Sequence, residues 1–258
     1  MISIIREYIK FISKSSNQHG VHSPFVYHFV TNCLYKKRNN EFQKLFLNCK
    51  NQLLNNKKTI TVKEYGIGST FFKTNKRSIA RIAKIAGITN KKASILTGII
   101  HYFKPLNILE LGTSLGLSTS SIKIGNKKSK IITLEGCLET SKIAQQLFNH
   151  QNFDGVDIVI GDFAETLPLT IKNNLFDFIY FDGNHTKKDT LDYFDYCLTT
   201  LTNESIWIFD DIYWSNEMKE TWSLIKKHPK VTVTVDLFYF GIVFFRKEQA
   251  KEHFKIRV

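Results

Sequence analysis

The residues best suited to chemistry follow short apolar runs of the chain. One such stretch is YFDGNH, in which an acid, a glycine, an amide and an imidazole come after the run that ends at Phe181. A carboxylate such as Asp182 can bind a cation, and His185, whose ordinary pKa is near neutral, can take a proton from a hydroxyl group. The open alternative is a turn with a helix cap, in which Asp182 and Asn184 serve the backbone and His185 is a loop histidine.

Four other apolar runs also end in acids or glycines. The first is followed by ELGTSLGLSTS, with Glu110, Gly112 and Gly116 ahead of Ser118, where we expect a helix to open. Glycines let the backbone approach a ligand, and a helix N-terminus favours an anionic group. The spacing E-x-G-x-x-x-G is neither the dinucleotide fingerprint nor a phosphate loop, which argues against a nicotinamide oxidoreductase.

The remaining runs end at Glu135, at Asp162 and Phe163, and at the pair Asp210 and Asp211. An acid ~20 residues past a glycine loop is placed to accept hydrogen bonds from a ribose. Asp162 can accept from an adenine amine, with Phe163 beside the ring.

Three carboxylates, those of Asp182, Asp210 and Asp211, end neighbouring predicted strands. They repel one another unless a proton or a cation neutralises them. Oxygen ligands of this kind suit magnesium or calcium, and could also hold manganese. In the open alternative, one acid is protonated or pairs with Lys187, and no metal binds.

The elements that must position these residues are read from the pattern of the chain. Short β-rich runs at 107–111, 130–134, 156–160, 176–181 and 205–209 alternate with helical segments. This alternation predicts a parallel sheet covered on both faces, with ligands bound at the carboxyl ends of its strands. The last two runs, VTVTVDLFYF and GIVFFRK, leave no room for a helix, so we expect them to pair antiparallel around Gly241.

The N-terminal part is predicted to be helical. Ser23 is a plausible cap with Pro24 at the first helical position, and two further short helices are expected within 77–103, before Pro105. His19 and His22 either line a substrate entrance or serve capping and packing. The glycine-rich stretch 64–69 is interpreted as a turn near the edge of a ligand site.

Composition bounds the class of protein. The chain has 258 residues, 43% of them hydrophobic, and its apolar runs stay well short of the ~20 residues of a membrane span. Arg6 and Lys10 interrupt the first apolar pattern, which indicates an amphipathic helix rather than a signal peptide, and we expect a cytoplasmic protein without a membrane partner. The four cysteines are far apart, which indicates reduced, buried thiols. The net charge of +13 comes from scattered lysines, so we favour solvated surface over a nucleic-acid footprint.

Taken in order along the chain, these motifs resemble the class I S-adenosylmethionine-dependent methyltransferases. The resemblance is strongest to the catechol and caffeoyl-CoA type O-methyltransferases, over roughly residues 77 to 247, and rests on ILELGTSLGLST, ITLEGC, IGDFAETLP, FDFIYFDGNH and IWIFDDIYW. It implies a Rossmann-like, doubly wound α/β fold with a mostly parallel seven-stranded sheet and an antiparallel C-terminal hairpin. A methyltransferase domain at 61–258 would follow an N-terminal helical extension at 1–60, which we expect to cover the acceptor side.

The resemblance also implies roles for individual residues. It places S-adenosylmethionine against Glu110, Gly112, Thr113, Ser114, Gly116, Ser118, Glu135, Gly136, Asp162, Phe163 and Asp182. It implies magnesium at Asp182, Asp210 and Asp211, and catalytic roles for His185 as a base and Asp182. The chain departs from the family in having Asp211 where asparagine is usual and His185 where lysine is usual. The sequence TNES also replaces the usual Pro-Gly-Gly turn before the fifth strand.

The expected reaction is methylation of an oxygen on a small-molecule acceptor. Two alternatives stay open: an RNA or protein methyltransferase, and a protein that binds the cofactor without transferring its methyl group. The chain has no N-P-P-Y-type motif after the fourth strand and no recognisable RNA-binding module, so nucleic acid is the less favoured partner. Both a monomer and a homodimer are compatible with the sequence.

Overall fold

The computed structural model describes residues 2–37, 39–63, 65, 72, 74–172 and 174–258. They group into two compact units. The terminal unit comprises Met1–Lys36 and Asn174–Val258, and the central unit comprises Lys37–Asn173. Residues 1–60 are therefore shared between both units, and the expectation that they form a separate domain stays a prediction.

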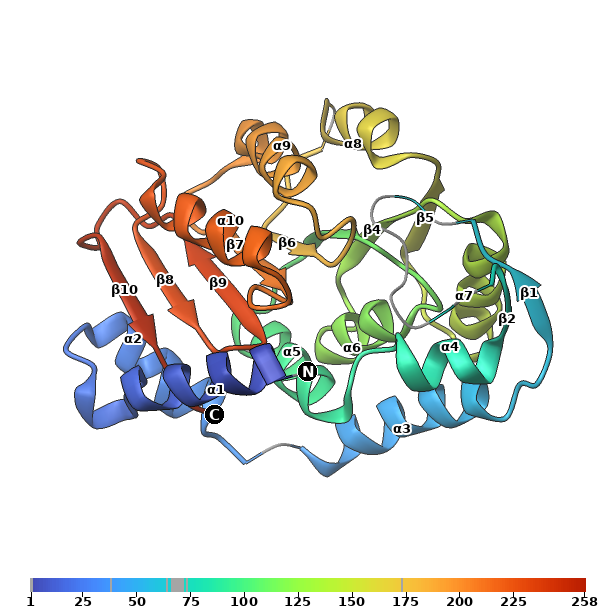
Figure 1. Cartoon of the computed structure of the whole chain (residues 1–258), viewed down its shortest axis with the longest axis horizontal. Helices are drawn as coiled ribbons and strands as arrows, with labels where there is room; N and C mark the ends of the chain where they lie inside the picture. The colour runs from blue at the N-terminus through green and yellow to red at the C-terminus, as the bar shows by residue number, and fades with distance from the viewer. Residues whose placement is uncertain (1, 38, 64, 66–71, 73, 173) are drawn as a thin grey trace. The chain divides into compact units, whose positions relative to one another are not determined.

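The central unit contains the strands that carry the glycine loop. Strands β3 (Asn107–Leu111), β4 (Lys130–Glu135) and β5 (Val156–Ile160) pair in parallel in the order β3-β4-β5. Helices α6 (Leu117–Gly125) and α7 (Leu138–His150) connect them, and α8 (Phe163–Lys172) follows (Figure 1). Parallel neighbours need such crossovers, and the three strands predicted here are confirmed.

The remaining elements of the central unit precede these strands in the chain. They are α3 (Asn40–Leu54), the antiparallel pair β1 (Thr59–Thr61) and β2 (Lys76–Ser78), α4 (Ile79–Ile85) and α5 (Asn90–Phe103). Helix α3 contacts α4, α5 and α6 through buried side chains that include Phe46 and Leu53. Helix α5 ends at Phe103, before Pro105, as predicted, and its C-cap Lys104 has left-handed backbone angles.

The terminal unit contains a mixed sheet in the order β10-β8-β9-β7-β6 (Figure 1). Strands β6 (Phe178–Phe181) and β7 (Ile206–Asp210) are parallel, whereas β9 (Phe240–Phe244) runs antiparallel to β7 and to β8 (Val233–Asp236). Helices α9 (Lys187–Cys197) and α10 (Asn216–Lys227) and the 3-10 helix η3 (Leu198–Thr200) complete this part. The sequence did not predict β10 (Glu252–Lys255), which pairs in parallel with β8.

The C-terminal hairpin confirms the predicted antiparallel pairing but not its turn. The chain reverses at residues 237–239, where Phe238 has a φ of 71°, and Gly241 lies inside β9. A Cβ atom at Gly241 would lie 2.7 Å from Cζ3 of the Trp222 ring. Glycine is therefore needed at this position because an indole packs against the strand, not because the backbone turns there.

The N-terminal helices of the terminal unit pack on this sheet. They are α1 (Ile2–Lys14), the 3-10 helix η1 (Gln18–Gly20), α2 (Pro24–Phe29) and the π-helix η2 (Val30–Leu34). The Ser23 side chain caps α2 by accepting a hydrogen bond from the Val26 amide, as predicted. Two phenylalanine rings contact Phe244 on β9. The centroid of the Phe244 ring lies 5.0 Å from that of Phe25 and 5.7 Å from that of Phe29.

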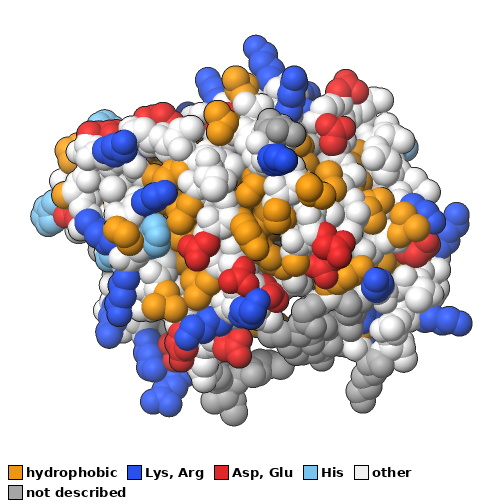
Figure 2. Space-filling view, turned by 90° about the horizontal axis from the view of Figure 1, so that it is seen from above, with side chains coloured by type: hydrophobic (Ala, Val, Ile, Leu, Met, Phe, Trp, Pro, Cys, Tyr) orange, Lys and Arg blue, Asp and Glu red, His pale blue; other side chains and the backbone are white. Residues whose placement is uncertain are grey.

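Charged side chains and cysteines are distributed differently in the molecule. On the face shown in Figure 2, Lys and Arg side chains occur singly or in small groups, and they form no continuous basic area there. The four cysteines are buried and unpaired with one another. Among the described residues, no helix is long and apolar enough to cross a membrane.

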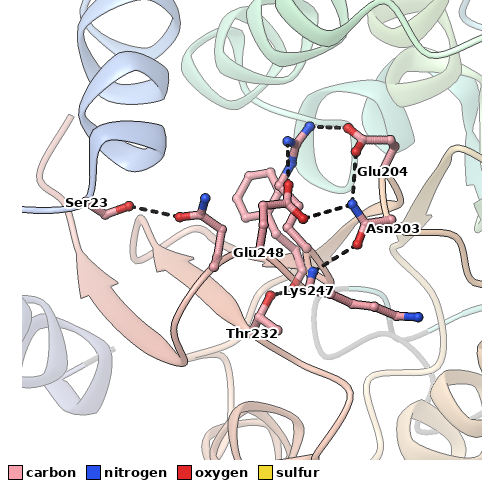
Figure 3. Close-up of polar contacts among 9 residues, drawn as sticks. Ser23, Asn203, Glu204, Thr232, Lys247 and Glu248 are labelled. Atoms are coloured by element: carbon pink, nitrogen blue, oxygen red, sulfur yellow. Dashed lines mark hydrogen bonds and ion pairs between the residues drawn. The ribbon is translucent and has the colours of Figure 1, made fainter.

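A polar network ties the end of β9 to the segment before β7 in the terminal unit (Figure 3). The Asn203 side chain accepts from the Lys247 amide at 2.9 Å and donates to Glu248 at 3.0 Å. Arg246 pairs with Glu204 and Glu248. These contacts lie among exposed side chains, so we expect them to contribute little stability individually.

Candidate active site

The glycine loop between β3 and α6 has the backbone that a close ligand approach requires. Gly112 and Gly116 have φ values of 109° and 83°, which glycine adopts most readily. Gly116 is the N-cap of α6, so Ser118 is the second residue of the helix and not its start. A Cβ atom at Gly116 would lie 2.6 Å from Cε1 of Phe148. Among the described residues, no side chain caps α6, which suits its first amides to an anionic ligand.

Glu135, at the end of β4, is held by three hydrogen bonds. Its carboxylate accepts from the Ser114 amide at 2.7 Å, from the Cys137 amide at 2.8 Å and from the Thr140 hydroxyl at 3.0 Å. Burial raises the pKa of Glu135, and the hydrogen bonds from these donors oppose that shift. The structure therefore brings the end of β4 to the glycine loop, as predicted, and places the carboxylate within a ring of donors.

Glu110 lies beneath the glycine loop. Its side chain is fully buried, and its Oε2 accepts from the hydroxyls of Thr119 at 2.5 Å and Thr133 at 2.7 Å. The Thr113 hydroxyl joins this network at 2.6 Å from that of Thr133, and burial raises the pKa of Glu110. Within the described part of the chain, Oε1 of Glu110 has no hydrogen-bond partner. The network braces the loop from below, and direct contact of Glu110 or Thr113 with a cofactor stays a prediction.

The end of β5 carries the residues expected near an adenine. Asp162 is half-buried, and its Oδ1 accepts from the Ala164 amide at 2.9 Å at the start of α8. Phe163 is buried, and Gly136 is half-buried directly after Glu135. Their contacts with an adenine remain predictions.

In the terminal unit, Asp210 at the end of β7 has a buried phenol as a partner. The Tyr180 hydroxyl donates to Oδ2 of Asp210 at 2.8 Å, and the Asp211 amide donates to Oδ1 at 2.7 Å. Burial and the neighbouring carboxylates raise the pKa of Tyr180 well above its ordinary value, so the phenol stays protonated and donates. Our sequence reasoning missed Tyr180. The available signal was its position two residues before Asp182, which places both side chains on one face of the strand.

The three carboxylates expected to bind a metal do not form a metal site in this arrangement. Among the described residues, no group of three or more His, Cys, Asp and Glu side chains is placed to hold an ion. Asp210 is 3% exposed, and both of its carboxylate oxygens accept hydrogen bonds. Magnesium at these three residues therefore stays a prediction, and we derive no catalytic step from a metal.

The stretch after β6 combines a turn with a charged pair. Asn184 has a φ of 53°, and its Nδ2 donates to the Tyr193 hydroxyl at 2.9 Å. Asn184 therefore has a structural role in a turn, as the alternative to a functional site required. Nε2 of His185 lies 3.6 Å from Oδ1 of Asp182, and both side chains are partly exposed. Asp182 is thus near enough to orient the imidazole.

Helix α1 packs on the loop that follows Asp211 in the terminal unit. The ring centroid of Phe11 lies 6.4 Å from that of Tyr213 and 5.5 Å from that of Phe238. The rings of Tyr213 and Phe238 stack on each other, with their centroids 4.9 Å apart. Lys219 of α10 pairs with Glu7 of α1 at 3.5 Å.

Two other expectations concern loops. His19 and His22 are exposed in the loop before α2, and their predicted role at a substrate entrance stays a prediction. The glycine-rich stretch 64–69 lies outside the described residues, apart from Tyr65.

The strands that carry these polar ends belong to a Rossmann-like α/β fold. Residues 109–212 match a family model described as a methyltransferase domain, so the chain contains such a domain and the predicted class is confirmed. The O-methyltransferase hkm8 of Aspergillus hancockii is 33% identical over 125 residues, which are 46% of this chain and 49% of that protein. The match thus spans about half the length of this curated relative.

Solved structures share the fold at low sequence identity. One is a methyltransferase of Podospora anserina, PaMTH1, with S-adenosylhomocysteine (SAH) bound. It has a TM-score of 0.55 and 19% identity, and the match covers 62% of this chain and 80% of that one. An O-methyltransferase of Bacillus cereus in complex with SAH has a TM-score of 0.52 and 19% identity, covering 84% and 96%. These structures confirm the predicted α/β fold.

Proposed function

We propose that this protein transfers the methyl group of S-adenosylmethionine to an oxygen atom of a small-molecule acceptor. The observation that carries the proposal is the Glu135 carboxylate, held at the end of β4 by the Ser114 amide of the glycine loop. The methyltransferase match over residues 109–212 and the O-methyltransferase relative support the same class of reaction.

Two features of the central unit support binding of S-adenosylmethionine. A carboxylate offers about four acceptor sites, of which Glu135 uses three in the structure, so at least one remains on Oε2 for a ribose hydroxyl. The uncapped start of α6 suits the carboxylate of the methionine part. When bound, the sulfonium supplies an activated methyl carbon.

The residues after β6 are suited to the proton that the acceptor loses. The acceptor oxygen attacks the methyl carbon, the carbon–sulfur bond breaks, and S-adenosylhomocysteine (SAH) leaves. Because Nε2 of His185 faces Asp182, Nδ1 is the nitrogen that accepts the hydroxyl proton. Asp182 stabilises the resulting imidazolium and holds its orientation.

The test is a methyl-transfer assay with labelled S-adenosylmethionine and a metabolite extract, followed by identification of the labelled product. His185→Ala should slow transfer roughly a hundredfold or more while SAH affinity is kept. Asp182→Asn should also lose transfer, and His150→Ala, at an exposed histidine at the end of α7, is the control. A His185→Ala enzyme with the normal rate would remove the base, and a wild type without SAH binding would refute the proposal as a whole.

A divalent cation remains a prediction from the three carboxylates. Its test is the same assay with a chelator and with added magnesium. Loss of transfer on chelation and recovery with magnesium would support it, and activity that is indifferent to the chelator would exclude it. Because Asp210 accepts from Tyr180, an ion would have to draw the carboxylates into another arrangement.

We also propose that α1 forms part of the acceptor side. It packs on the loop that follows Asp211, through the ring of Phe11, which is 2% exposed. Deletion of residues 2–14 is a sharper test than deletion of 1–60, because the longer deletion removes α3 and its buried side chains from the central unit. Phe11→Ala should impair transfer more than SAH binding. Ile9→Ala, at a 64% exposed position of the same helix, is the control. Full activity in the Phe11 variant would rule this out.

A further inference from the structure

The segment that follows β1 is tied to the end of β4 within the central unit. The Lys63 amide donates to Sγ of Cys137 at 3.3 Å, and this thiol in turn donates to the Thr61 carbonyl at 3.8 Å. Cys137 comes two residues after Glu135, whose carboxylate we assign to the ribose. Residues 61–63 therefore lie beside the proposed nucleoside site, although more than seventy positions separate them from Cys137 in the sequence.

The ring of Tyr65 occupies the space where a side chain at Gly136 would stand. A Cβ atom added at Gly136 would lie 2.5 Å from Cδ2 and 2.6 Å from Cε2 of that ring, closer than real Cβ contacts come. Gly136 is not among the glycines with positive φ, so its backbone angles do not demand glycine. The close approach of the Tyr65 ring explains why this position, directly after Glu135, lacks a side chain.

Lys63 lies over this ring. Its ammonium nitrogen is 4.7 Å from the centroid of the Tyr65 ring. The pKa of Lys63 is raised, first by its hydrogen bond with Tyr65. Tyr65 and Lys63 thus lie beside the strand end that carries Glu135, which is the position proposed for the ribose.

We propose that Tyr65 is a binding residue for the adenosyl group, and that its ring supplies the aromatic surface that Gly136 cannot provide beside the ribose-binding carboxylate. The inference rests on the proposed function and names a further residue of the same site. An aromatic ring beside a ribose site suits a purine because stacking needs only the flat face of the base. The glycine at 136 serves to seat the ring.

The experiment is calorimetric titration of the full-length protein with SAH. Tyr65→Ala should weaken binding roughly 5- to 150-fold, the range found when a base loses a stacking ring, whereas Tyr65→Phe should stay near the wild type. Gly136→Ala should weaken binding because the new methyl group displaces the ring. Tyr102→Ala, at an exposed tyrosine of α5 in the same unit, is the control and should have no effect.

The double variant Tyr65→Ala/Gly136→Ala separates seating of the ring from a direct role of Gly136. If Gly136 acts through Tyr65, the double variant should bind SAH no more weakly than Tyr65→Ala alone. Additive losses would assign Gly136 to the ligand directly and overturn that part of the inference. Melting temperatures without ligand will show whether each variant is folded, and titration with adenosine should reproduce the loss because adenosine carries the base.

Two results distinguish this inference from the proposed function. Wild-type protein that binds SAH, together with Tyr65→Ala protein that binds it equally well, would overturn the role of Tyr65 and leave the methyltransferase assignment intact. Wild-type protein that does not bind SAH would overturn both.

Discussion

Replacement of Glu135 by glutamine tests the cofactor site most sharply. Both carboxylate oxygens accept from backbone amides, Oε2 from Ser114 at 2.7 Å and Oε1 from Cys137 at 2.8 Å. A glutamine in either orientation turns an NH₂ group toward one of these N–H donors. Glutamine is therefore a poor replacement here, and we expect Glu135→Gln to weaken SAH binding nearly as much as Glu135→Ala.

The magnitude follows from the acceptor sites that are left. With three hydrogen bonds made inside the protein, the carboxylate keeps about one site for a ribose hydroxyl. A hydrogen bond to a charged group contributes about 1.5–3 kcal/mol, which corresponds to a loss of affinity of roughly 10- to 150-fold. A much larger loss would mean that the ribose displaces Thr140 or Cys137 and takes two hydrogen bonds.

The assay is titration with SAH, accompanied by chemical denaturation without ligand. Each buried amide left without an acceptor costs about 1–3 kcal/mol, so both variants should also lose stability. Glu139→Gln, four residues further on and exposed in an ion pair with Lys142, is the matched control. Wild-type affinity in Glu135→Gln would refute the assignment of this carboxylate to the ribose.

Three further changes test the packing around the site. Tyr180→Phe removes the donor to Oδ2 of Asp210 and should lower the free energy of unfolding by about 1–3 kcal/mol in urea denaturation; unchanged stability would show that this hydrogen bond contributes nothing. Burial raises the pKa of Glu110 in the folded state. Above the ordinary pKa of a glutamate, the unfolded chain therefore releases a proton that the folded protein keeps. The contribution of Glu110 to stability then falls as the pH rises. As pH rises above the ordinary glutamate pKa of about 4.3, the melting temperature of Glu110→Gln should therefore increase relative to that of the wild type. A difference that does not change with pH would contradict the raised pKa of Glu110. Gly241→Ala should cost roughly 1–3 kcal/mol because its methyl group meets the Trp222 ring, and the cost should shrink in a Trp222→Leu background if this contact is the cause.

The strands and their polar ends could be predicted from the sequence because their signals are local. Short apolar runs specified β3 and β5 to the residue. The Ser23 cap and the helix end before Pro105 are also local, since a side chain or a proline acts on the backbone within four residues. The methyltransferase class was predicted from the resemblance of these motifs to those of a known family.

Only the tertiary structure decided which partners these residues have. The approach of Trp222 to Gly241, of Tyr65 to Gly136 and of Tyr180 to Asp210 joins segments far apart in the chain, and no periodicity in the sequence reports such contacts. The addition of β10 beside β8 is likewise a pairing between strands that the local pattern left open. The strand-end acids show the same division. The sequence placed Glu110 and Glu135 at strand ends, but burial and the hydrogen-bond donors around them decided that one carboxylate lies beneath the loop and the other beside it.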